Sequence, residues 1–407
     1  MHQTDSPYRA YGYRWVVLAV YFLLTFVIAL QWLTFASVER AAREAYGVSP
    51  LAVDMLSIVF MAVFLVMCIP ASWMIDRYGI RVGVGFGAIL TGVFGIFKGL
   101  FAHSYAMMLV AQLGLGVAQP FILNAVTAIA AKWFPVNERA GAVGVGTLSQ
   151  FLGFVAVNLA TPHLVHAVNG TYDLRPMLML YGVISVVVSA AFLVFMREAP
   201  PTPPSEHAGH ERLMSLDGVK HLVHLKDMVW LLGLFFIGLG AFNAIATCID
   251  QIAEAKELSS AQAGAIMGAM FGAGILGALV VPPISDKIQR RKPFLVAGVT
   301  LVAPGILGMT LARGYGGMLT WSAFVGFFLL GVAGPIGFQY GAEIGYPAPE
   351  ALSQGLILLA GQISGILFVV GMNIVGMGVG MAALVVLSLV NIPIVLRLHE
   401  SQVAEVE

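Results

Sequence analysis

The chain has 407 residues, of which 59% are hydrophobic and 10% charged, and its mean hydropathy is +0.89. Soluble domains average about 25% charged residues, so this composition excludes a soluble protein and indicates an integral membrane protein. The 21 Lys and Arg residues balance the 21 Asp and Glu residues, which argues against a nucleic-acid partner. The expected surroundings are the lipid bilayer of an inner (plasma) membrane.

Twelve apolar stretches are each long enough for a membrane helix, which needs about 20 residues. They cover residues 15–37, 51–75, 82–102, 105–131, 141–164, 177–196, 228–252, 261–284, 294–312, 318–340, 351–373 and 375–396. A proline-rich polar stretch after the sixth predicts an extended linker that leads to a short surface helix. We therefore expect an all-α protein with two six-helix bundles, at residues 1–197 and 228–407, joined by a linker at 198–227.

Lys and Arg residues are distributed unevenly between the two sides of the predicted bundle. Fifteen of the 21 lie on the side that holds both termini and the linker, and five lie on the other side. Cytoplasmic loops carry the excess of such residues, so both termini and the linker are expected in the cytoplasm. Lys98 falls within the third helix, where we expect its long side chain to reach the membrane interface.

Polar residues interrupt the fourth stretch, "GLGVAQPFILNA" at residues 114–125, and a near copy lies at residues 329–343. The run from Gly116 to Pro120 matches the run from Gly331 to Pro335, and Gln339 falls where Asn124 did. Gly and Pro breaks are tolerated in membrane helices where the freed backbone groups are buried or line a cavity. Paired breaks in two halves point to a transporter's binding site.

The loops after the second and eighth helices also match each other. "DRYGIR" contains Asp76, Arg77 and Arg81, and "DKIQRRK" contains Asp286, Lys287 and Arg291. Such acidic and basic groups form charge-assisted hydrogen bonds, so we interpret the loops as latches that hold one conformer. Simple anchoring at the membrane surface is the alternative. Repeated landmarks with the same topology indicate parallel repeats.

Polar side chains at membrane depth are candidates for function. Some are expected to join helices, since such amide bonds contribute about 0.6 kcal/mol on average. Of these side chains, Trp32, Gln119 and Gln362 are the ones most expected to face a cavity. The polar candidates for substrate binding are Trp32, Gln119, Asn124, Gln150, Asn243, Gln339 and Gln362.

Few charges fall near the predicted cavity. Asp250 and Glu343 end the seventh and tenth helices, where each either attracts a cation to the cavity mouth or caps its helix. The first, fourth and fifth helices contain no Asp or Glu at depth, so coupling to protons is not supported and facilitated diffusion is the simpler expectation.

Other signals are given structural roles. No catalytic set suggests an enzyme, and no metal site or cofactor is expected. Cys68 and Cys248 lie in apolar runs and are expected to be core residues. Gly264, Gly268 and Gly272, four residues apart, are expected to allow close helix packing.

With its repeated halves and its "DRYGIR" loop, the chain resembles the major facilitator superfamily. Within that superfamily it resembles the feline leukaemia virus subgroup C receptor family of haem, choline and ethanolamine transporters. The stretches that carry this resemblance are "ALQWLTF" (29–35), "MLSIVFM" (55–61), "GVAQPFIL" (116–123), "GAFNAIATCIDQI" (240–252) and "GYPAPEALSQGLILLAGQISGILF" (345–368).

The resemblance implies that Trp32, Gln119 and Gln362 line the central cavity. Phe60 and Asn243 stand where those relatives carry cavity tyrosines, so Phe60 lacks a hydroxyl and Asn243 lacks a ring. A cage for a choline-like cation, in which an aromatic ring faces the ammonium, would therefore be incomplete.

We therefore expect a monomeric transporter that moves a small organic solute, such as a choline- or ethanolamine-like cation, by uncoupled alternating access. One alternative is an exporter of a bulky metabolite such as haem, which needs a wider cavity. Another is a receptor or sensor that binds a ligand without moving it.

Overall fold

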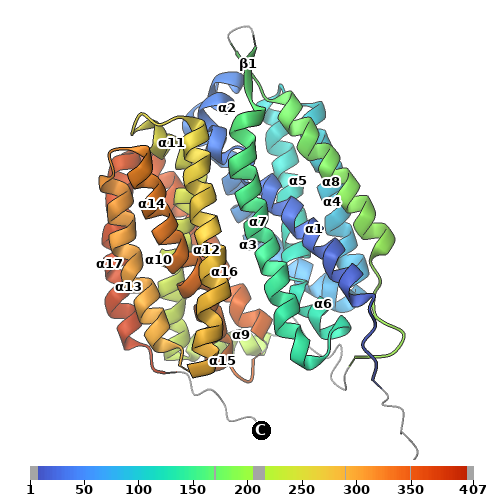
Figure 1. The fold of residues 1–407 in the computed structure, drawn as a ribbon. Coiled ribbons are helices and arrows are strands. Elements are labelled where there is room, and N and C mark those ends of the chain that lie inside the picture. The colour runs from blue at the N-terminus through green and yellow to red at the C-terminus, as the bar shows by residue number, and fades with distance from the viewer. Residues whose placement is uncertain (1–7, 169–170, 205–215, 289, 349, 401–407) are drawn as a thin grey trace, which may run out of the picture.

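A computed structural model describes residues 8–168, 171–204, 216–288, 290–348 and 350–400. Within these ranges, twelve helices or helical stretches are long and apolar enough to cross a membrane. They form one bundle of roughly parallel and antiparallel helices (Figure 1). The predicted all-α membrane fold with twelve spans is confirmed.

The described residues of the first half form eight α-helices, a 3₁₀ turn and a small hairpin. They are α1 (Arg14–Trp32), η1 (Ala36–Val38), α2 (Glu39–Tyr46), α3 (Pro50–Tyr78), α4 (Ile80–Leu100), α5 (Tyr105–Leu123), α6 (Val126–Trp133), α7 (Val136–Leu164), β1 (His166–Val168), β2 (Thr171–Asp173) and α8 (Arg175–Phe195). The two strands pair antiparallel, with Ala167 opposite Tyr172.

The predicted linker contains a short helix, α9, and the helices of the second half come after it. The elements are α9 (Leu216–His224), α10 (Lys226–Thr247), α11 (Ile249–Glu254), α12 (Ser260–Ile288), α13 (Lys292–Leu311), α14 (Tyr315–Val325), the π-helical segment η2 (Gly326–Ala333), α15 (Gly334–Ile344), α16 (Glu350–Val375) and α17 (Met377–Arg397). The sequence did not predict the short elements α2, α11 and the hairpin.

The helical breaks occur where Gly and Pro interrupt the apolar sequence. The fourth span ends its first helix at Leu123 and resumes at Val126, shortly after Pro120. The tenth span passes through η2 directly before Gly334 and Pro335. Proline has no N–H to donate and its ring crowds the preceding turn, and π-helical segments often occur at functional sites. Both halves therefore carry a local distortion in the matching helix.

The halves pack together along α7 and α12. A Cβ added at Gly264 would lie 2.1 Å from the carbonyl oxygen of Asn158, so only glycine allows this approach. Gly268 packs against the side chain of Leu159, whose Cδ2 would lie 2.6 Å from an added Cβ. Gly272 has no atom within 4 Å of its Cβ position, so the packing role predicted for it is wrong.

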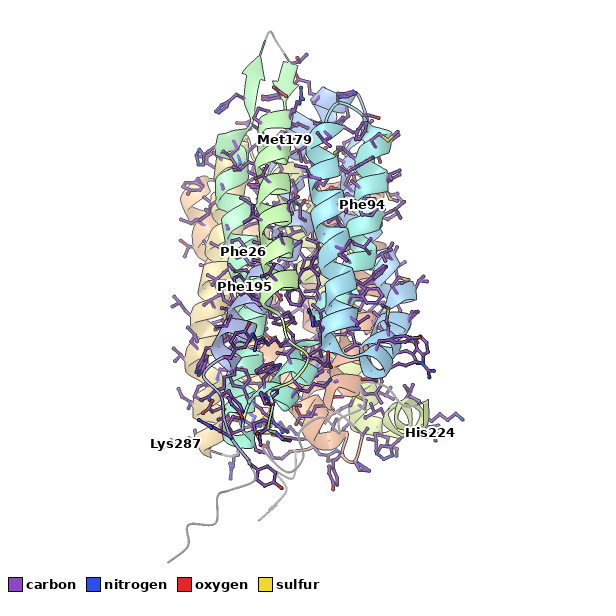
Figure 2. The ribbon with its side chains drawn as sticks, turned by 90° about the vertical axis from the view of Figure 1, so that its right-hand side faces the viewer. Phe26, Phe94, Met179, Phe195, His224 and Lys287 are labelled. Carbon is purple, nitrogen blue, oxygen red and sulfur yellow. The ribbon has the colours of Figure 1, made fainter. Side chains whose placement is uncertain are left out.

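The two ends of the bundle differ. Both ends of the described chain lie at one end together with α6, α9 and α15, which we name the terminal end (Figure 1). The other end carries α2, α11 and the β1–β2 hairpin, and we name it the hairpin end. Figure 2 shows His224 and Lys287 at the terminal end and Met179 toward the hairpin end.

Candidate functional site

A cavity of about 790 Å³ lies between the two halves. Its wall takes residues from both halves, and it runs from the middle of the bundle to the terminal end. It reaches the surface there, where Val136, Ala140 and Asp286 are exposed. The predicted site residues that line it are Trp32, Gln119, Gln150, Asn243, Gln339 and Gln362.

Trp32 lies at the deep end of the cavity, where α1 stops. Its indole Nε1 donates a hydrogen bond to the carbonyl oxygen of Ser57 at 3.2 Å. Its ring stacks on Phe60 at 6.3 Å between centroids and meets Phe154 edge to face at 5.5 Å. These contacts fix the ring in one orientation.

Gln119 and Gln362 approach the cavity from opposite halves, on α5 and α16. They are 2% and 8% exposed. The Oε1 atoms of both are buried and have no hydrogen-bond partner within the described part of the chain. Leaving a buried acceptor unpaired costs about 1–3 kcal/mol, so these two oxygens are suited to a donor brought by a ligand.

Asn243 and Gln339 make bonds within the second half. Asn243 Nδ2 donates to the carbonyl oxygen of Gly361 at 3.1 Å, which joins α10 to α16. Gln339 Nε2 donates to Glu343 Oε1 at 3.2 Å, nearer the terminal end. Gln150, on α7, lines the wall between these levels.

Two predicted site residues do not line this cavity. Phe60 is fully buried behind the Trp32 ring, so it supports the indole from α3. Asn124 Nδ2 donates to Ser72 Oγ at 3.0 Å and to the carbonyl oxygen of Cys68 at 3.2 Å. The amide of Asn124 therefore joins the end of α5 to α3, because the helical break directs it away from the cavity.

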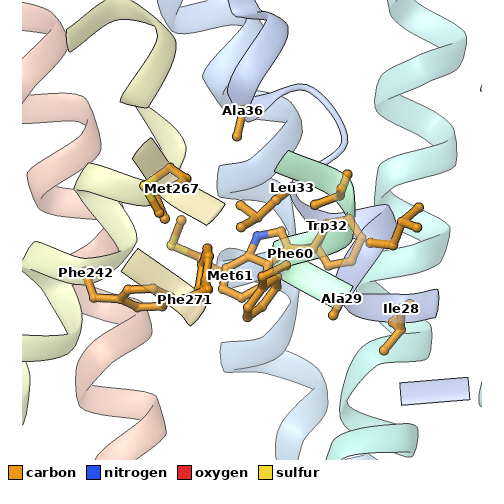
Figure 3. Close-up of a cluster of buried hydrophobic side chains, with 14 of the residues drawn as sticks. Ile28, Ala29, Trp32, Leu33, Ala36, Phe60, Met61, Phe242, Met267 and Phe271 are labelled. Carbon is orange, nitrogen blue, oxygen red and sulfur yellow. The ribbon is translucent and has the colours of Figure 1, made fainter. Parts of the chain in front are cut away.

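An apolar plug separates the cavity from the hairpin end. It continues from Trp32 and Phe154 to Phe271, whose ring centroid is 4.9 Å from that of Phe154, and then to Phe242 at 5.7 Å. Figure 3 shows Trp32, Phe271 and Phe242 in this cluster. Trp32 and Phe154 belong to the first half, whereas Phe242 and Phe271 belong to the second. The plug therefore closes the cavity only while the halves touch here.

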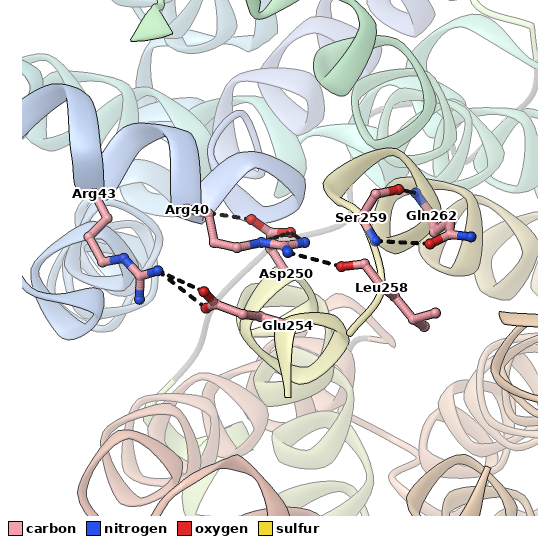
Figure 4. A network of polar contacts seen from close by, with 7 residues as sticks. All are labelled: Arg40, Arg43, Asp250, Glu254, Leu258, Ser259 and Gln262. Atoms are coloured by element: carbon pink, nitrogen blue, oxygen red, sulfur yellow. Dashed lines mark hydrogen bonds and ion pairs between the residues drawn. The ribbon is translucent and has the colours of Figure 1, made fainter. Parts of the chain in front are cut away.

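Polar bonds across the halves seal the hairpin end. Asp250, which is fully buried, accepts from the backbone N–H of Arg40 at 2.9 Å and from its guanidinium at 2.6 and 3.1 Å (Figure 4). Arg43 forms a more exposed pair with Glu254 at 2.9 Å. Asp250 lines no open cavity mouth in this state, because α11, which follows α10, places its carboxylate in the seal.

Asp54 forms a second crossing point, which the sequence analysis missed. It is 2% exposed on α3, and its Oδ2 accepts from Gln251 Nε2 and Asn373 Nδ2, both at 2.7 Å. The Cys248 thiol lies 3.5 Å from the same oxygen. Burial, with the nearby Asp54 carboxylate, raises the pKa of Cys248 well above its usual value. The signal for this crossing point in the sequence was an acidic residue near the start of an otherwise apolar stretch.

Lys98 does not reach the membrane interface. It is 1% exposed, and its Nζ lies 2.8 Å from Gln31 Oε1 and 3.2 Å from Thr34 Oγ1. The expected interfacial anchor is therefore wrong, because α4 turns this residue toward α1 and away from lipid.

At the terminal end, Arg291 forms its ion pairs within the second half. The Arg291 guanidinium binds Asp286 and, at 2.8 Å, Glu343. Burial disfavours its charge, but hydrogen bonds to Glu343 and Asp286 outweigh that effect and raise the pKa of Arg291. Glu343 is not among the residues that line the cavity, but its carboxylate binds Arg291 and Gln339, which do line it.

The remaining predicted latch residues lie at the surface. Asp76 and Lys287 are exposed near the ends of α3 and α12. Arg77 lies over the rings of Trp73 and Tyr78. Arg81 contributes its backbone N–H, which donates to Glu198 Oε2 at 2.8 Å.

An acidic residue that was not among the predicted site residues binds the start of the third membrane span in each half. That span is α4 in the first half and α13 in the second. Glu198, three residues after α8, accepts from the N–H groups of Ile80 and Arg81. Glu400, three residues after α17, accepts from those of Arg291 and Lys292 at 2.6 and 3.0 Å. Carboxylates stabilise helix N-termini in this way. The matched caps support the repeat inferred from the two loops.

Comparison with known proteins agrees with this geometry. A family model described as "Major Facilitator Superfamily" matches residues 17–369. An uncharacterized MFS-type transporter of Caenorhabditis elegans is 30% identical over 91% of this chain. The choline/ethanolamine transporter FLVCR1 of Felis catus is 30% identical over 87% of it, and human FLVCR2 is 27% identical over 88%.

This chain spans 66% of the length of the nematode protein and 66% of the length of the feline one. The similarity also extends to a solved structure. A bacterial homolog of the human lysosomal transporter Spinster superposes with a TM-score of 0.75 at 14% identity, over 95% of this chain and 97% of that one. The chain belongs to the major facilitator superfamily, a family of membrane transporters for small molecules.

Proposed function

We propose that the protein carries a small organic cation, of the choline or ethanolamine kind, by alternating access as an uncoupled uniporter. The observation that carries this proposal is the meeting of Trp32, Gln119 and Gln362 in one cavity bounded by both halves. An aromatic face attracts an ammonium group by about 0.5–2 kcal/mol. The two unpaired amide oxygens can accept hydrogen bonds from a hydroxyl or an N–H group.

The relatives support the same substrate class. FLVCR1 of Felis catus is named as a choline/ethanolamine transporter, and it is 30% identical to this chain. Asn243 supplies an amide where a ring is expected in that family, and its Nδ2 is already bonded to Gly361. The proposal therefore commits to an organic cation and leaves the choice between the two compounds to measurement.

The lining of the cavity supports uncoupled transport. Among the described lining residues, the acids are Asp286 and Glu350. Both are exposed at the terminal end, whereas the middle of the cavity presents aromatic rings and amides. Proton relays in carriers use Asp, Glu or His side chains at membrane depth, and the described residues that line the middle of this cavity include none of these.

The protein is proposed to act as a monomer in the inner (plasma) membrane. The excess of Lys and Arg at the terminal end supports an orientation with that end in the cytoplasm. In that orientation the cavity opens inward, while the plug and the polar seal close the outside. Opening the hairpin end and closing the terminal end would then give the opposite state.

Uptake into proteoliposomes tests the proposal. We expect the purified protein to take up labelled choline or ethanolamine, and Trp32→Ala and Gln119→Ala each to reduce uptake at least tenfold while remaining folded. Trp321→Ala is the matched control, because Trp321 is 37% exposed on the outer face of α14 and should leave uptake unchanged. Imposing a pH gradient should not drive the flux.

Each other outcome has a defined meaning. Normal uptake by both cavity variants would remove these residues from the site. A flux that follows the pH gradient would contradict the uniport. Transport of haem, without choline or ethanolamine, would favour the bulky-metabolite alternative, and saturable binding without uptake would favour a receptor.

A further inference from the structure

Lys98 is a buried cation that the proposed transport cycle does not use. It lies in the last turn of α4 and is 1% exposed. Among the described residues, the ion pairs do not include it. Burying a charge without compensation is costly, so the atoms around its ammonium must supply that compensation.

Those atoms all belong to the end of α1 and the turn that follows it. Nζ donates to Gln31 Oε1 at 2.8 Å, to Thr34 Oγ1 at 3.2 Å and to the carbonyl oxygen of Gln31 at 3.4 Å. It also lies 5.1 Å from the centre of the Phe35 ring. An ammonium has three N–H donors, and each has an acceptor here.

The position of these acceptors explains why a lysine is suited to this site. The last four carbonyls of a helix have no intrahelical partner, and that end of the helix carries partial negative charge. Thr34 Oγ1 also bonds the carbonyl oxygens of Leu30 and Gln31, both at 3.0 Å. Lys98 therefore offsets the partial negative charge at the C-terminal end of α1.

The same cluster is tied to a third helix. Gln31 Nε2 donates to Ser185 Oγ at 2.9 Å and to the carbonyl oxygen of Tyr181 at 3.3 Å, both on α8. The side chain of Gln31 thus connects Lys98 on α4 to α8. Two helices that do not line the cavity, α4 and α8, therefore fix the backbone turn that carries Trp32.

We propose that Lys98 is a positioning residue for Trp32. It fixes the backbone at the end of α1, while Ser57 and Phe60 hold the ring from α3. The indole is then presented to the cavity at a set depth and angle. This inference rests on the proposed function, because it takes Trp32 as the group that meets the substrate.

The test is a double-mutant cycle on uptake into proteoliposomes, with labelled choline and labelled ethanolamine as probes. In the native protein, Lys98→Met should raise KM about tenfold, as expected for loss of charge-assisted hydrogen bonds, and change the maximal rate less than twofold. In a Trp32→Phe background, which keeps a smaller ring, the same change should leave KM within twofold. Such non-additivity is the signature of residues that act together.

A merely structural role predicts a different pattern. Lys98→Met would then lower thermal stability and maximal rate in both backgrounds, and any change in KM would be the same in both. That result would overturn the inference. If Lys98→Met does not fold, Thr34→Val, which removes one acceptor, carries the test; it should raise KM about threefold in the native background alone, and an equal change in both would contradict the inference.

The cycle separates this inference from the function on which it rests. Normal uptake by Trp32→Ala would remove Trp32 from the site, and both proposals would fall. Impaired uptake by Trp32→Ala, with equal effects of Lys98→Met in the two backgrounds, would leave the proposed function standing and reject the role of Lys98.

Discussion

The two ends of the bundle hold their charges in different ways. At the hairpin end, Arg40 binds Asp250 and Asp54 binds Gln251, so the bonds cross from one half to the other. At the terminal end, Arg291 binds Asp286 and Glu343 within the second half, and Lys132 binds Glu198 within the first. The cavity extends to the terminal end.

This difference indicates which end acts as a gate in the present state. A bond that crosses the halves must break before they separate, whereas a bond within one half moves with it as a rigid body. Opening the hairpin end therefore costs free energy. The apolar contacts of the plug, from Trp32 through Phe154 to Phe271, increase that cost. Alternating access requires that the end closed by bonds between the halves opens while the other end closes.

The largest expected effect comes from Arg40→Ala. It removes the guanidinium from Asp250, which is fully buried, and leaves that carboxylate only the backbone N–H of residue 40; breaking such an ion pair costs about 3–5 kcal/mol. Because Arg40 itself is 23% exposed, we take the low end, which corresponds to roughly 100-fold more of the state open at the hairpin end. Labelling of Cys248 by a hydrophilic maleimide, in a Cys68→Ala background, measures this opening.

The chemistry of Cys248 sets the sign of that signal. The thiolate is the form that reacts, and the raised pKa of the buried thiol keeps it protonated. Opening removes the burial and lets the pKa fall, so labelling of Arg40→Ala should increase with pH. Arg43→Ala is the matched control, since its pair is 33% and 41% exposed and such pairs contribute about 0.2–1 kcal/mol. Equal labelling of both variants would contradict the seal.

Asp54→Asn should have a smaller effect. It replaces a buried carboxyl oxygen that accepts hydrogen bonds from both Gln251 and Asn373, and we expect the closed hairpin end to lose about 1.5 kcal/mol of stability. Hydrogen exchange of the α11 amides should accelerate about tenfold. Asp173→Asn, at the same end but bonded within the first half to the N–H of Arg175, should leave that exchange unchanged; an equal acceleration would show general loosening instead.

Arg291→Ala should have the smallest effect on the hairpin end. It removes bonds to Asp286 and Glu343 and should lower the melting temperature, because Arg291 is 6% exposed. Cys248 labelling should change less than twofold, whereas Arg290→Ala, on an exposed neighbour, should change neither quantity. A large change in labelling would support the latch expected from the loop sequence and contradict a terminal end held within each half.

Some of this organisation could be predicted from the sequence. Helix length and apolar composition determined the twelve spans, because each span must satisfy its own backbone in lipid. The paired Gly and Pro breaks located Gln119, since an amide next to a helical distortion in an apolar stretch has few structural explanations. Asn124 shows the limit, because a break changes the direction of the following side chains and sequence spacing does not give that direction.

The seal could not be predicted for a different reason. Arg40 and Asp250 are 210 residues apart. They lie in the short helices α2 and α11, just beyond the apolar parts of α1 and α10, where the sequence alone suggests a charged residue of a loop. Their pairing depends on how α2 and α11 fold back over the hairpin end. Lys98 was assigned to the interface for the same reason, since a single sequence does not show which face of α4 meets α1.

The most direct test of the account measures distances across both ends in one experiment. Spin labels at Glu44 and Glu257 report the hairpin end, and labels at Val136 and Lys287 report the terminal end, all at exposed positions in a background without Cys68 and Cys248. We predict that Arg40→Ala lengthens the first distance and shortens the second. Distances that lengthen together, or a change at one end alone, would contradict alternating access about the shared cavity.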